Sequence, residues 1–418
     1  MNTPIHKLLL YVSMWCMFTP FVAYAPGFPG EYQPFFLLAT VLSLAFSSQV
    51  AIAGSVTPSD LRRVKVSLAF VALWCLACGV EILASGRTGS GTLFFRFANL
   101  ALLGFLVTSQ GFVQAATQRR GVLFWVLVSY AVFGSLQFAG LLPANLPFVN
   151  RSTAEVSDLL DTGRGVPAFA TEPSTFAGVV VATLVTHHLA CHHTGKLTSK
   201  GILLTGAYCL FVLSKSTVFF IFFIAAGALA LAPLAARHPF RSVASLAMLL
   251  LTGAALLPVA QPRTYELMEA ILSSSDPGSL IEAAATLGTR SFSYRITPIV
   301  GVPHFLVQDL FSMRGDSCYP YLFLEFSCME DASSITGLYV IGYSLPRALS
   351  ALMFFWALAR TLRSYRSNNP ALTFWLWLSL LSFLHVSGNS PFFAIYFWLA
   401  FVLISPESRR PALSPAAP

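Results

Sequence analysis

The stretch RGVPAFATEPST, residues 164–175, runs directly into the apolar stretch FAGVVVATLVTHHL, residues 176–189. Pro173 suits the first turn of a helix, because it lacks the N–H group that would be unpaired there. The free N–H groups at a helix start favour anions. We therefore expect Glu172, Ser174 and Thr175 at a helix start, with Arg164 shortly before them. Glu172 and Ser174 are either simple helix caps or functional groups at a membrane edge.

The composition is typical of a polytopic helical membrane protein, so we expect an all-α fold. Charged residues make up 10% and apolar residues 56% of the chain, whereas soluble domains are about 25% charged. The net charge of +8 comes from basic residues scattered between apolar runs. A positive-inside bias explains these residues better than a nucleic-acid partner does.

The hydropathy pattern predicts about twelve spanning helices in a single transmembrane domain, residues 1–418. Residues 7–25 resemble a signal peptide, but Pro26 makes a poor cleavage junction, so we expect an uncleaved first helix. The seventh and eighth spans are joined only by residues 214–216 and should form a tight helical hairpin. The expected spans are residues 8–25, 34–54, 64–84, 92–111, 121–140, 169–189, 201–214, 216–235, 241–260, 336–358, 371–386 and 391–405.

The distribution of charge predicts the orientation. With both termini in the cytoplasm, most of the 25 basic residues and few of the 17 acidic residues fall inside. Two long loops then lie outside, a first loop at residues 141–168 and a large loop at residues 262–335. Within the large loop we expect a partly helical start, an interfacial helix in residues 290–311 and a polar, loop-like end.

Charged side chains in these outer loops are the candidate functional groups. Arginine makes bidentate contacts with phosphate oxygens, although single arginines also contact headgroups or neighbouring acids. The candidate arginines are Arg164, Arg290, Arg295 and Arg314. His304 is a candidate acid or base, or an ordinary interfacial histidine.

Other groups allow two interpretations as well. His187, His188, Cys191 and two further histidines are either a metal site or, as we prefer, an interfacial segment on the cytoplasmic side. Cys318 and Cys328 lie in the large loop, where an oxidising compartment favours a disulfide over two buried thiols.

Several short motifs together resemble the Wzy-type O-antigen and exopolysaccharide polymerases, in the superfamily that also holds the O-antigen ligases. The resemblance covers roughly residues 120–390 as an order of features. The motifs are Arg164, Glu172-Pro173-Ser174, Leu213-Ser214-Lys215-Ser216-Thr217, Ser291-Phe292-Ser293-Tyr294-Arg295 and the glycine-flanked residues 337–342.

This resemblance implies a metal-independent, cofactor-free glycosyltransferase of the GT-C type. Such an enzyme joins oligosaccharide repeats linked to undecaprenyl pyrophosphate, at the periplasmic face of a bacterial inner membrane. Membrane lipids and a chain-length regulator are the further partners implied. Arginines would stabilise the pyrophosphate leaving group, and Glu172 or His304 would act as the base. The implied catalytic residues are Glu172, Arg164, Arg295 and His304, and the implied substrate-binding residues are Arg290, Ser174, Arg314 and Lys215.

Two other functions remain open at this point. One is an O-antigen ligase-type transferase of a finished glycan, which the sequence separates poorly from a polymerase. The other is a secondary transporter or lipid-linked oligosaccharide flippase, which predicts charges within several spans and repeat symmetry.

Overall fold

The described part of the chain is helical apart from one β-hairpin. The computed structural model describes residues 8, 11–12, 15–16, 18–22, 72, 76, 121–143, 146, 149, 165–193, 197–237, 239–260, 265–266, 269, 273, 318–321, 324–328, 359 and 369–385. Its helices are α6 Gly121–Phe138, α8 Pro173–His193, α9 Lys200–Ala207, the π-helix η2 Tyr208–Ser214, α10 Thr217–Arg237, α11 Pro239–Ala260 and α16 Pro370–His385. Its strands are β1 Cys318–Tyr321 and β2 Leu324–Cys328.

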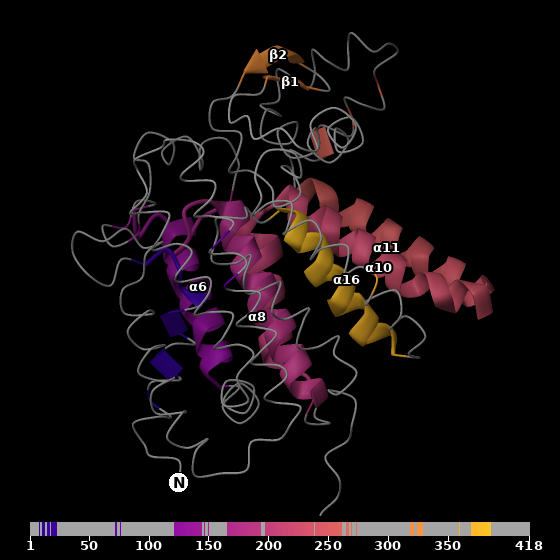
Figure 1. Cartoon of the computed structure of the whole chain (residues 1–418), viewed down its shortest axis with the longest axis horizontal. Coiled ribbons are helices and arrows are strands. Elements are labelled where there is room, and N and C mark those ends of the chain that lie inside the picture. The colour runs from indigo at the N-terminus through magenta and orange to yellow at the C-terminus, as the bar shows by residue number, and fades with distance from the viewer. Residues whose placement is uncertain are drawn as a thin grey trace, which may run out of the picture.

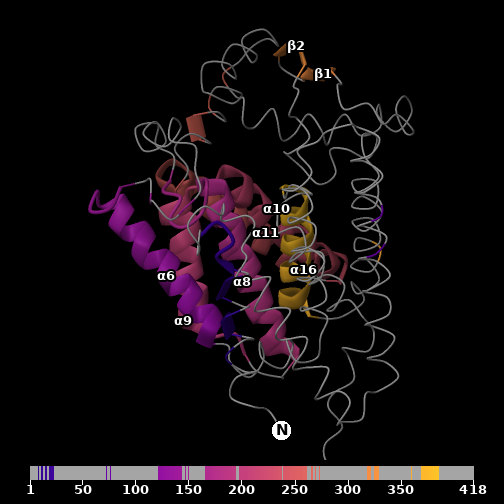
Figure 2. The ribbon, with the colours of Figure 1, turned by 60° about the vertical axis from the view of Figure 1, so that its left-hand side comes forward.

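Helix α8 lies at the centre of the described helices. It packs against α6, α9, η2, α10 and α16, and Figures 1 and 2 show it between α6 on one side and α10 and α16 on the other. Most of α8 is buried, whereas only a third of α6 is. Helix α8 therefore forms the core on which the neighbouring described helices pack.

Two described helices, α6 and α8, are long and apolar enough to cross a membrane. The apolar stretches Lys200–Ser214, Thr217–Ala232 and Pro370–Ser382 are shorter. The large apolar side chains of Trp125, Val132 and Phe138 on α6 are exposed, as expected for a surface against lipid. The described helices therefore support the expected class, a membrane protein.

The bounds of α6, α9 with η2, α10, α11 and α16 lie within two residues of the expected spans. Helix α8 begins at Pro173 instead of residue 169, because proline suits the first helical position, and it ends at His193 instead of residue 189. The first expected span, residues 8–25, was too long, since residues 19–22 are not helical and Val22 forms an isolated β-bridge with Val149. Tyr265, Glu266, Glu269 and Ser273 are helical, as expected for the start of the large loop. The expected spans 34–54, 92–111, 336–358 and 391–405, and the interfacial helix, lie outside the described residues.

Two expectations were wrong. The end of the large loop, expected to be loop-like, contains the antiparallel β-hairpin β1–β2, whose aromatic residues favour strands. The seventh and eighth spans do not form a tight hairpin along their length. Helix α9 packs on α6 and α8, whereas α10 packs on α11 and α16, so the chain turns away at Lys215, which is left-handed with φ 44°.

Candidate functional site

The segment of residues 165–172, which we call the docked loop, lies on one face of α6. The receiving residues are Tyr130, Phe133, Gly134 and Gln137, whose spacing places them on one side of a helix. Phe169 meets Tyr130 edge-on, with ring centroids 5.2 Å apart, and Phe133 at 4.3 Å. Residues 165–170 are all buried. This stretch, expected in part to be an external loop, is thus a packed element of the fold.

Gln137 binds the docked loop at its tightest bend. The backbone N–H of Ala168 donates to Gln137 Oε1 at 2.8 Å, and Gln137 Nε2 donates to the carbonyl of Pro143 at 3.2 Å. Ala168 has φ 49°, a left-handed conformation that residues with a Cβ rarely adopt. Sequence reasoning missed Gln137, although an amide near the end of an otherwise apolar helix was a signal.

The docked loop also contacts the connecting turn, residues 214–216, which joins η2 to α10. The N–H of Val166 donates to the carbonyl of Leu213 at 2.8 Å. Gly165 lies so close to the backbone of Leu213 and Ser214 that a Cβ there would overlap both residues. Two segments about fifty residues apart in the sequence therefore touch through their backbones.

The connecting turn has its own unusual geometry. It follows a π-helix, a rare form that is frequent at functional sites. The Ser214 hydroxyl donates to the carbonyl of Leu210 at 2.9 Å. Lys215 is left-handed, and its Nζ lies 5.4 Å from the centre of the Phe138 ring, a cation–π contact at the end of α6.

The start of α8 presents Glu172 to the surroundings. The N–H of Phe176 donates to the backbone carbonyl of Glu172 at 2.9 Å, so Glu172 caps the helix while Pro173 is its first residue. The Ser174 hydroxyl donates to Glu172 Oε2 at 3.1 Å. Ser174 is buried, whereas Glu172 is exposed. The exposed carboxylate is thus oriented by a buried hydroxyl.

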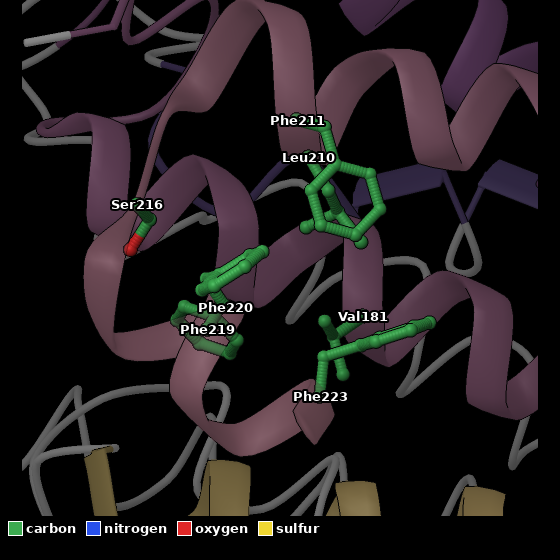
Figure 3. A pocket seen from close by; sticks show the side chains of 7 residues that line it. All are labelled: Val181, Leu210, Phe211, Ser216, Phe219, Phe220 and Phe223. Carbon is green, nitrogen blue, oxygen red and sulfur yellow. The ribbon is translucent and has the colours of Figure 1, made fainter. Parts of the chain in front are cut away.

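A small aromatic cavity lies behind the connecting turn. Figure 3 shows its lining, with Ser216 on one side and the rings of Phe211 and Phe223 on the other. Its volume is about 10 Å³, enough for about one water molecule. A sugar or a lipid chain does not fit in a cavity of this size.

Three of the eight candidate residues lie in the described part of the chain, namely Glu172, Ser174 and Lys215. Glu172 and Ser174 lie at the start of α8, and Lys215 lies in the connecting turn. Arg164 directly precedes Gly165 in the chain. Arg164, Arg290, Arg295, His304 and Arg314 lie outside the described residues.

The histidines of α8 lie toward the other end of that helix. The Sγ atom of Cys191 is 3.7 Å from His187 Nδ1, and His188 Nδ1 is 2.8 Å from the Thr198 hydroxyl. Within the described ranges, no three His, Cys, Asp or Glu residues are grouped as metal ligands. The described histidine contacts are therefore packing and hydrogen-bonding contacts.

Comparison with known proteins returned no matching family model, no matching curated protein and no matching solved structure.

Proposed function

We propose that this protein is a membrane glycosyltransferase that polymerises lipid-linked oligosaccharide repeats. The substrate would be oligosaccharide on undecaprenyl pyrophosphate, and the site would face the periplasm, in a GT-C-like bundle of about twelve spans. The observation that carries the proposal is the contact between the docked loop and the connecting turn. These two segments hold two of the motifs on which the resemblance to the polymerases rests.

The contact brings together groups that suit transfer from a lipid pyrophosphate. Helices α8 and α10 begin near each other, since a Cβ on Gly178 would lie 3.4 Å from the Phe219 ring. Helix starts favour negative charge, and Lys215 adds a cation beside them. Arg164, the residue before Gly165 in the chain, would add a second cation. These groups would hold the pyrophosphate and stabilise its charge as it leaves.

Glu172 would serve as the general base. Its exposed carboxylate accepts a hydrogen bond from Ser174, which orients it without covering it. In the proposed step the acceptor hydroxyl loses its proton to Glu172 while its oxygen forms the new glycosidic bond. The bond from the donor sugar to the pyrophosphate breaks, and the lipid pyrophosphate leaves with that electron pair. Arg290, Arg295, Arg314 and His304 would complete the site from the large loop.

The experiment compares variants in a deletion strain, with polysaccharide length read on a gel and membrane levels by blot. Glu172→Gln should abolish polymer at normal protein abundance, because an amide cannot take the proton. Lys215→Gly should also shorten the polymer, because glycine keeps the left-handed backbone while the charged side chain is removed. Thr205→Ala is the matched control, since that hydroxyl bonds only within α9, to the Gly201 carbonyl. Wild-type polymer from both Glu172→Gln and Lys215→Gly would refute the proposal.

The deletion strain separates the two other functions. Loss of a polymerase leaves short glycans attached to the acceptor, whereas loss of a ligase leaves long glycans unattached. Loss of a flippase leaves the lipid-linked repeats on the cytoplasmic face.

A further inference from the structure

We propose that Gln137 is a positioning residue that holds the docked loop in the conformation required for glycosyl transfer. The inference rests on the proposed function for its catalytic consequence. The restraint made by the hydrogen bonds of Gln137, which we call the clamp, lies within the described residues and is tested separately.

Both polar atoms of the buried Gln137 side chain are hydrogen-bonded. It is only 1% exposed on a helix that is otherwise almost wholly apolar. A polar group buried in such a helix is unfavourable unless it is hydrogen-bonded. Its oxygen accepts from Ala168 and its nitrogen donates to Pro143. Gln137 therefore ties the docked loop to the chain that leaves α6.

The hydrogen bond to Gln137 falls where the docked loop is strained. Ala168 has φ 49°, and such a conformation persists only when its surroundings enforce it. The turn is closed by the N–H of Ala170, which donates to the Pro167 carbonyl at 2.8 Å. Phe169 is held by rings on α6. Gln137 supplies the polar part of this restraint, because it bonds the strained residue directly.

The restraint reaches both ends of the docked loop. At one end Gly165 rests on the connecting turn, next to Arg164 in the chain. At the other end Glu172 caps α8. A shift of about 1 Å in a catalytic group can reduce a rate about 100-fold. Release of Ala168 would therefore change the separation of the two proposed catalytic groups without removing either.

The test measures opening of the docked loop by thiol labelling in intact membranes. Val166 is fully buried, so Val166→Cys introduces a thiol that reacts only when the loop leaves α6. Peptide mass spectrometry distinguishes this thiol from the native cysteines. Gln137→Met removes both hydrogen bonds at similar volume and should raise the labelling rate about tenfold or more. Gln137→Asn, too short to reach Ala168, is the second variant if Gln137→Met does not reach the membrane.

Two further variants make the test specific. Ser129→Ala is the matched control on α6, because that hydroxyl bonds only within the helix, to the Val126 carbonyl at 2.7 Å. It should leave the rate unchanged. Adding Ala168→Gly to Gln137→Met should slow labelling at least about threefold, because glycine adopts the left-handed conformation without strain. Gln137→Met alone should shorten the polymer, and adding Ala168→Gly should partly restore its length. General destabilisation does not produce such a rescue.

The outcomes separate the two proposals. If Gln137→Met labels no faster than the parent, or Ser129→Ala labels as fast as Gln137→Met, the clamp is wrong whatever Glu172→Gln does. If Ala168→Gly does not slow labelling, the strained residue is not what Gln137 holds, and the inference also fails. If labelling behaves as expected but Glu172→Gln and Lys215→Gly both make normal polymer, the proposed function fails and the catalytic consequence of the clamp fails with it.

Discussion

Substitution of Gly165 by alanine tests the contact on which the site depends. The added Cβ would overlap the carbonyls of Leu213 and Ser214, which are backbone atoms and cannot rotate away as a side chain does. Overpacking a well-packed site costs about 1–3 kcal/mol. If the docked loop moves away to relieve this overlap, the hydrogen bond from the Val166 N–H to the Leu213 carbonyl breaks. The buried N–H is then unpaired, which costs about 1–3 kcal/mol. We therefore expect Gly165→Ala to destabilise the protein by about 2–3 kcal/mol.

Two glycines of α6 serve as graded controls. At Gly134 a Cβ would lie 2.9 Å from the Leu213 Cδ1 atom, the end of a flexible side chain, so Gly134→Ala should cost about 1 kcal/mol or less. At Gly121 nothing lies within 4 Å, and alanine should be neutral or slightly stabilising because glycine disfavours helix.

The assay is thermal unfolding of the purified protein in detergent, followed by intrinsic fluorescence, with polymer length measured in cells. The expected order of melting temperatures is Gly121→Ala highest, then Gly134→Ala, then Gly165→Ala. A melting temperature for Gly165→Ala equal to that of Gly121→Ala would refute the close contact between the docked loop and the connecting turn.

Three further predictions concern the remaining candidates. Cys318 pairs with Cys328 in the β-hairpin, and the Cα–Cα distance of about 5 Å in such a pair suits a disulfide. Both cysteines should therefore label only after reduction, and equal labelling before and after reduction contradicts this. Reporter fusions at Asp158 and Asp276 should report the periplasm and fusions at Lys196 the cytoplasm; a cytoplasmic signal at Asp276 would overturn the site assignment. Arg164→Lys and Arg295→Lys should lose polymer nearly as completely as the alanine variants, because lysine makes no bidentate contact; normal polymer from the lysine variants removes that contact from the mechanism.

The sequence alone predicted the membrane class and most described helix ends. Long apolar runs have few ways to avoid water, and Pro173 has a defined place at a helix start, so both signals are local. The start of α8 with Glu172 and Ser174 beside it was predicted for the same reason. The β-hairpin was missed because its strands are only four and five residues long, too short for periodicity to decide.

The meeting of the docked loop with the connecting turn, and the place of Gln137 between them, was decided only by the tertiary structure. Helix α8 is apolar on all sides, so its sequence has no face that shows which neighbours it takes. The left-handed conformation of Ala168 is equally invisible, because alanine ordinarily avoids it and adopts it here only under restraint from α6. Local chemistry thus determined where the helices begin and end, whereas the packing of distant segments determined which polar groups share a surface.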